Sequence, residues 1–230
     1  MLARNFERIA LATEYAEDGG TLVRRETASE LRRWERPVRM QVGFGPSVGP
    51  DARVREENAV GAYAARLARV TGHPISRVAT GGNFHVLFLS EDDRAGFEPR
   101  LRELVPGLAA SSVRAFLAPG RSTLCLVIAF SDGSSPGYTH AVALIRAEHP
   151  EALRLACIHE ELAQGLGLPN DSRQARPSIF NDDDEFGLLT THDEMLLRIL
   201  YDDRLSAGMS PEEAAPIARQ IATELVGGAS

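Results

Sequence analysis

Residues 160–170 read Glu-Glu-Leu-Ala-Gln-Gly-Leu-Gly-Leu-Pro-Asn and give the strongest indication of the fold. The helix that carries it is predicted to begin at Pro150 and Glu151, because proline is accepted in a first helical turn and an acidic side chain is favourable there. The same helix is expected to run to about Leu166. The stretch therefore forms the end of a helix and the turn that follows it.

The polar side chains of this motif are expected to gather on one side of the helix. Residues four apart project from the same face, so Glu160 and Gln164 would point into one site, with Glu161 rotated by about 100° beside them. Gly167 permits a left-handed or otherwise strained turn, which would bring Asn170 back towards the first two residues. The spacing therefore predicts one polar site.

This spacing resembles the zinc-binding pattern of the metzincin proteases, His-Glu-x-x-His-x-x-Gly-x-x-His. Glu160, Gln164 and Asn170 stand at the three metal-ligand positions. Glu161 stands at the position of the general base, and Gly167 stands at the turn. The resemblance implies a zincin-like (metzincin-type) fold with an active-site helix, in which all three ligand histidines are replaced.

Two later segments agree with this resemblance. Metzincins place a methionine-containing turn beneath the metal, and residues 177–180 (Pro-Ser-Ile-Phe) follow the motif at a suitable distance. Ser178, Ile179 and Phe180 are therefore expected to shape the site, with the phenylalanine at the methionine position. The helix expected from Thr191 to Tyr201 resembles the closing helix of matrixin-like domains.

Further residues complete a pattern that covers nearly the whole chain: Phe6, Glu14-Tyr15, Trp34, Pro37-Val38, Cys157, the motif through Ser172, Ser178–Phe186 and Leu189–Asp193. With them the sequence is similar to a bacterial family of exported, often lipid-anchored proteins that form a domain of unknown function. The similarity implies a zincin-like fold and an exported setting. It implies no particular activity.

The donor atoms decide which metal the site could bind. Glu160, Gln164 and Asn170, with Asp171 as a rival to Asn170, offer only oxygen donors. Zinc favours imidazole and thiolate and is a poor match, whereas harder divalent cations accept oxygen ligands. Without a metal, Glu160 and Glu161 could share a proton as an acid–base pair. A divalent metal and a metal-free site both stay open.

Other polar residues are expected to have structural roles. His85 lies within a predicted strand and could face the cleft, whereas His140 and His192 are expected to be structural. His159 is expected at the surface or behind the site. The acidic run at residues 181–185 lacks the spacing and the glycine of an EF-hand loop, so a solvated loop is expected there rather than a cation site.

The two cysteines, Cys125 and Cys157, allow two interpretations. They are either two small buried thiols or one disulfide that ties a strand to the motif helix, the second requiring an oxidising compartment. By themselves two cysteines cannot supply a four-ligand zinc site.

Length and composition limit the class of protein. With 43% hydrophobic residues, the 230-residue chain can bury one substantial core. We expect a single domain over residues 1–230, with an upper lobe at 1–168 and a lower lobe at 169–230. A net charge of −7 argues against a nucleic-acid partner. No apolar run approaches the roughly 20 residues of a membrane span, and export would require that a signal segment had been removed.

The order of periodic segments predicts an α+β fold, with helices packed on a mixed sheet. Helices are expected at residues 3–17, 51–70, 91–104 with a break near Pro99, 150–166, 191–201 and 211–225. Strands are expected directly after Pro37 and at residues 75–79, 84–89, 124–130 and 141–147.

The leading hypothesis is an exported metzincin-like protein whose zinc ligands are replaced and whose cleft binds a peptide or a cell-envelope partner. The alternative is an active metal-dependent hydrolase with Glu161 as general base. A third interpretation is an unrelated α+β domain in which Glu160 and Glu161 belong to an ordinary helix surface.

Overall fold

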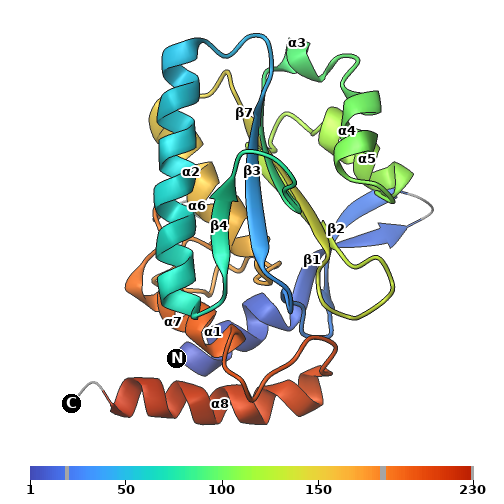
Figure 1. Cartoon of the computed structure of the whole chain (residues 1–230). Helices are drawn as coiled ribbons and strands as arrows, with labels where there is room; N and C mark the ends of the chain where they lie inside the picture. The colour runs from blue at the N-terminus through green and yellow to red at the C-terminus, as the bar shows by residue number, and fades with distance from the viewer. Residues whose placement is uncertain (19–20, 182–184, 229–230) are drawn as a thin grey trace.

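The computed structural model describes residues 1–18, 21–181 and 185–228 and has an α+β architecture (Figure 1). The helices are α1 (Leu2–Ala10), α2 (Pro50–Thr71), α3 (Glu91–Arg94), α4 (Glu98–Leu104), α5 (Ala110–Leu117), α6 (Glu151–Gln164), α7 (Thr191–Leu200) and α8 (Pro211–Gly227). The strands are β1 (Ala12–Asp18), β2 (Thr21–Ala28), β3 (Val38–Phe44), β4 (Ile75–Val78), β5 (Phe84–Leu89), β6 (Cys125–Phe130) and β7 (His140–Arg146). The predicted α+β class, mixed sheet and C-terminal helices are confirmed.

The main sheet has the strand order β4-β3-β5-β7-β6. Neighbouring strands are parallel from β4 to β7, whereas β6 runs antiparallel to β7. β5 is buried along its whole length, because both faces of the sheet are covered. β6 is half-buried throughout and forms one edge of the sheet.

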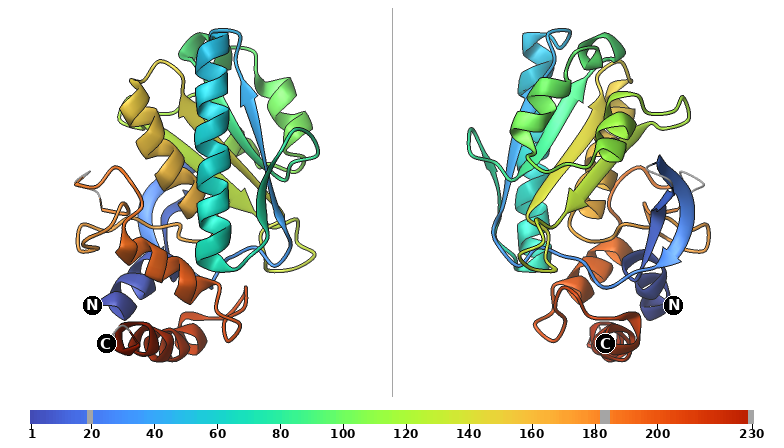
Figure 2. Two further views of the ribbon diagram at one scale, coloured as in Figure 1. Left: turned by 60° about the vertical axis from the view of Figure 1, so that its left-hand side comes forward. Right: turned by 90° about the vertical axis from the view of Figure 1, so that its right-hand side faces the viewer.

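Helices cover the two faces of the sheet in separate groups. Figure 2 shows α2 and α6 on one face and α4 and α5 on the other. Along β5, the side chains of Phe84, Val86 and Phe88 join the core beneath α2 and α6. Leu87 and Leu89 join a smaller core with residues of α4 and α5. Because successive side chains of a strand point to opposite faces of the sheet, β5 contributes to both cores and separates them.

The lower end of the molecule in Figure 1 combines the first helix with the last two. α1 contacts both α7 and α8, and α7 also contacts α2. Buried side chains of α1 and α7, such as Phe6 and Leu196, belong to the same core as Phe84 of the sheet. The lobes at 1–168 and 169–230 stay a prediction, although α1 packs with the lower group.

The helix expected over residues 3–17 is wrong beyond Ala10. β1 pairs antiparallel with β2 there. Thr13 and Tyr15 favour strands, and Asp18 followed by two glycines is a hairpin signal in the sequence. The apolar spacing that predicts a helix holds for α1 but not for the residues after it.

Two smaller corrections concern helices. α5 was not predicted, because its segment Ala-Ser-Ser-Val-Arg-Ala-Phe-Leu has few helix-start signals and no side-chain cap. α2 begins one residue earlier than expected, with Gly49 at the N-cap and with Pro50 and Asp51 in the first turn. Among the described residues, no helix combines the length and apolar character needed to cross a membrane.

Candidate functional site

Helix α6 carries the motif and packs one side against the sheet. Its N-cap is Pro150, and its buried residues include Cys157, Leu162 and Glu161. The side chain of Glu161 is only 4% exposed. Glu160 is half-buried and lines a cavity beside β6. The two adjacent carboxylates therefore have different environments, one inside the protein and one at the cavity.

The amide groups at the other two ligand positions are held by hydrogen bonds within the protein. Nε2 of Gln164 donates to Oδ1 of Asp171 at 2.9 Å. Nδ2 of Asn170 donates to the carbonyl oxygen of Arg8 at 2.8 Å. The backbone N–H of Asn170 donates to the carbonyl oxygen of Ile9 at 3.2 Å. Asn170 is 1% exposed and satisfies carbonyl groups at the end of α1. The structure thus joins Gln164 to Asp171 and directs the amide nitrogen of Asn170 to α1.

The turn after α6 needs a glycine at position 167. Gly167 has φ of 126°, and a Cβ atom there would overlap the carbonyl oxygen of Arg32. Nearby, Nε1 of Trp34 donates to the carbonyl oxygen of Gly165 at 2.8 Å. The end of the motif helix is therefore fixed against the segment that precedes β3.

The Ser178–Phe180 turn is anchored by a buried carboxylate of α7. Asp193 is fully buried, and its Oδ1 accepts a hydrogen bond from the hydroxyl of Ser178 at 2.5 Å. Its Oδ2 accepts the backbone N–H groups of Ile179 at 3.2 Å and Thr190 at 2.9 Å. Phe180 is fully buried in the main core, and Ile179 lines the cavity beside α6. The turn thus supports the motif helix.

Residues after this turn include the acidic run at 181–185, of which 182–184 lie outside the described residues. Nδ2 of Asn181 donates to the carbonyl oxygen of Ala175 at 2.9 Å. Glu185 forms an ion pair with Arg176 at 2.9 Å. The two described ends of the run thus contribute to loop structure.

A disulfide joins the edge strand to the motif helix. The sulfur atoms of Cys125 in β6 and Cys157 in α6 are 2.09 Å apart. A cavity of about 300 Å³ opens beside the disulfide. The cavity is lined by Leu124, Cys125, Ala152, Leu153, Ala156, Cys157, Glu160, Ile179, Phe186 and Gly187.

The donor atoms of this region do not fit the zinc site of a metzincin. The amide nitrogens of Gln164 and Asn170 already donate to protein oxygens. Sγ of Cys125 and one carboxylate oxygen each from Glu160 and Glu161 lie within 4.8 Å of one another, but the cysteine is in the disulfide. Zinc binds thiolate, imidazole and carboxylate, and a disulfide sulfur is none of these.

His159 lies behind the motif helix rather than in the cavity. Its ring stacks on Tyr63, with ring centroids 4.1 Å apart, and its Nδ1 accepts the backbone N–H of Leu189 at 3.0 Å. Burial lowers the pKa of His159 to about 4, so the ring is neutral at pH 7. It fixes the segment before α7 to α6.

The expectation that His85 could face the cleft is wrong. Its neighbours Phe84 and Val86 point towards α6, so His85 points to the opposite face of the sheet. There it lines a separate cavity of about 240 Å³ with residues of α4. The ring of His192 lies elsewhere again, with Nε2 2.9 Å from Nδ2 of Asn5, and burial lowers its pKa.

The comparison with protein families identifies the chain. The model described as "Protein of unknown function (DUF2927)" matches residues 1–220. The chain belongs to the DUF2927 family. The expected membership of a family of unknown function is thereby confirmed. No curated protein matches this DUF2927 chain.

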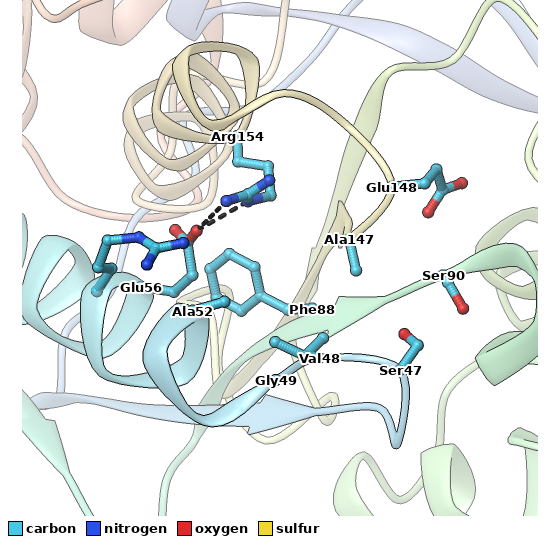
Figure 3. A pocket seen from close by; sticks show the side chains of 11 residues that line it. Ser47, Val48, Gly49, Ala52, Glu56, Phe88, Ser90, Ala147, Glu148 and Arg154 are labelled. Carbon is cyan, nitrogen blue, oxygen red and sulfur yellow. Dashed lines mark hydrogen bonds and ion pairs between the residues drawn. The ribbon is translucent and has the colours of Figure 1, made fainter.

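A second cavity of the DUF2927 chain, of about 380 Å³, lies where β3, β5 and β7 end and α2 and α6 begin (Figure 3). The ring of Phe88 lies between the Glu56–Arg154 ion pair on one side and Ser47, Ser90 and Glu148 on the other. Nε of Arg154 is 2.8 Å from Oε1 of Glu56. The charges of Glu56 and Arg154 therefore neutralise each other, and Arg55 adds a further positive charge to the lining.

Sequence reasoning missed several residues that fix the site. Asn5, Tyr63 and the Glu56–Arg154 pair contact residues that are far away along the DUF2927 sequence. Of these residues, only Glu56 could have been noticed in the sequence. A charged side chain on the buried face of an amphipathic helix requires a partner. The identity of that partner depends on the packing of α2 against α6.

Proposed function

We propose that this DUF2927 chain is an exported, zincin-like domain that binds a peptide in extended conformation and does not act as a zinc protease. The zincin-like assignment is supported by the motif helix under a mixed sheet, the turn at Gly167 and the buried Ser178–Phe180 turn. The loss of zinc chemistry is supported by the hydrogen bonds of Gln164 and Asn170.

One observation carries the peptide-binding proposal: an edge strand runs beside an apolar cavity. In the described part of the chain, β6 pairs with β7 and has no strand on its other side. An extended peptide can add to such an edge through main-chain hydrogen bonds, while pockets select alternate side chains. The cavity beside Cys125 would receive one side chain of that peptide.

The lining of the cavity suggests which side chain fits. Leu124 and Phe186 are 38% and 36% exposed, and both line the cavity. Leu153 and Ile179 add further apolar surface. A leucine or phenylalanine of the peptide would bury this surface, at about 25 cal/mol per Å² of apolar area.

Export is supported by the disulfide. Cys125 and Cys157 are bonded to each other, and structural disulfides persist mainly in oxidising compartments. A single disulfide between a strand edge and a helix would also hold the cavity open. A cell-envelope protein with an extended apolar segment is a suitable partner.

Peptide binding can be tested by fluorescence anisotropy with labelled hexapeptides, which match the six residues of β6. The probes alternate apolar and polar residues and carry Leu, Phe or Glu at the third position. We expect the Leu or Phe probe to bind and the Glu probe to bind at least about tenfold more weakly. Leu124→Arg should weaken binding by a similar factor, because it places a charge at the cavity.

Two controls make this test specific. Val54→Arg alters an exposed apolar side chain on α2 and should leave binding unchanged. A probe with N-methylated backbone amides should lose binding, because it cannot pair with a strand. Equal binding of the methylated probe would contradict edge pairing. Metal-dependent cleavage of the probe that is lost in Glu161→Gln would instead support the hydrolase alternative.

A further inference from the structure

Four side chains near the cavity form a cluster whose chemistry depends on the disulfide. Cys157, Glu160 and Glu161 lie at positions i, i+3 and i+4 of α6, which share one face of a helix. Cys125 reaches the same face from β6 through the disulfide. One ligand atom each from Cys125, Glu160 and Glu161 already lies within 4.8 Å of the others.

In the oxidised chain this cluster lacks the donors for tight zinc binding. The sulfur atoms of Cys125 and Cys157 carry no charge while they are bonded to each other, and the thiolate is the form that binds metals. Only the carboxylates of Glu160 and Glu161 remain, and two oxygen donors of this kind favour zinc weakly.

We propose that reduction of the disulfide converts this cluster into a zinc site formed by Cys125, Cys157, Glu160 and Glu161. A dithiol reductant supplies two electrons and two protons, the S–S bond breaks, and the reductant forms its own disulfide. Zn²⁺ then displaces the two thiol protons to solvent and binds both thiolates. The resulting set of two sulfur and two oxygen ligands suits tetrahedral zinc.

The distances require only small movements. Bonds of about 2.0 to 2.3 Å place the ligand atoms of tetrahedral zinc roughly 3.3 to 3.8 Å apart. The three atoms of Cys125, Glu160 and Glu161 are within 4.8 Å, so side-chain rotations can close the gap. The two sulfur atoms, which are bonded to each other in the oxidised chain, must instead move apart.

Access to the cluster is provided by the cavity beside α6. Both cysteines and Glu160 line it, so a reductant and a metal ion share one entrance. Because zinc binds the reduced form, it must make the disulfide easier to reduce. Each tenfold rise in free zinc above the dissociation constant should raise the midpoint potential of the couple by about 30 mV.

Cobalt titration of the whole chain tests this proposal. We expect one equivalent of Co²⁺ to give tetrahedral ligand-field bands and thiolate-to-cobalt charge-transfer absorption in the reduced chain, displaced by Zn²⁺. The oxidised chain should show neither signal. In the reduced chain, Glu160→Gln and Glu161→Gln should each weaken binding at least about tenfold, because each removes one charged ligand.

Glu151→Gln is the matched control, since Glu151 begins the same helix and is 69% exposed. It should bind cobalt like the parent. The proposal is overturned if the reduced chain binds no more tightly than the oxidised chain. It is also overturned if both glutamine variants bind like the parent, which is the result expected from an unfolded dithiol. Peptide binding is measured on the oxidised chain and cobalt binding on the reduced chain. The peptide-binding proposal and the zinc-site proposal can therefore fail independently.

Discussion

At the scale of single residues, the polar side chains of the motif differ mainly in what they contact. Gln164 and Asn170 donate through their amide nitrogens to Asp171 and to the carbonyl oxygen of Arg8. A buried amide is stable only when its hydrogen bonds are made, so these contacts stabilise the turn after α6 and its packing on α1. Glu160 and Glu161 lie beside the disulfide, where they form part of the proposed zinc site.

His85 should make the protein less stable in acid. Burial, together with the nearby His140, lowers its pKa from 6.5 to about 4. The unfolded chain therefore takes up a proton below pH 6.5 while the folded chain does not, so stability is lost as the pH falls from 6.5 to about 4. His85→Gln should reduce this loss by at most about 3 kcal/mol.

Urea unfolding at about pH 7 and about pH 4.5 measures the difference. His149→Gln, which changes a histidine on the loop before α6 whose Nε2 lies 3.1 Å from the carbonyl oxygen of Leu124, is the matched control. The same pH dependence in His85→Gln and the parent would contradict the buried neutral ring.

At the scale of elements, the motif helix is defined by how it ends. Gly167 has a positive φ of 126°, and the path of the chain there passes the backbone of Arg32 and the side chain of Leu200. These neighbours come from the segment before β3 and from α7. The turn therefore joins three parts of the structure.

Gly167→Ala should destabilise the fold by more than about 3 kcal/mol, because it combines a strained φ with overlap against backbone. Thermal or urea unfolding measures the change, and soluble yield reports complete failure to fold. Gly227→Ala provides the control, because a Cβ at Gly227 in α8 meets nothing within 4 Å. That variant should change stability by less than about 1 kcal/mol. Equal effects of the two variants would show that the turn is not constrained.

At the scale of the whole molecule, one continuous core connects the sheet to the lower helices. The single tryptophan, Trp34, is fully buried within it. Its ring stacks on Phe84 of β5 at 6.2 Å between centroids, and its backbone N–H donates to the hydroxyl of Tyr201 at 3.4 Å. Trp34 therefore contacts the sheet, the end of α6 and the end of α7.

Unfolding of the oxidised chain should be a single cooperative transition, because the sheet and the helices α1, α7 and α8 share one continuous core. Tryptophan fluorescence and far-ultraviolet circular dichroism should give the same midpoint in urea. Loss of helical signal before the change in fluorescence would show that the lower helices unfold separately.

The helix that carries the motif and the turn after it could be predicted from the sequence, whereas the β1–β2 hairpin and α5 were not. The i, i+4 spacing of Glu160 and Gln164, with Pro150 before them and Gly167 after them, defined the helix and its turn, because capping and periodicity act over a few residues. Which groups come into contact depends on the packing of distant segments. Asn170 contacts Arg8, 162 positions away, and Cys125 reaches the motif from an edge strand. Such partners depend on how distant elements pack, which local patterns do not encode.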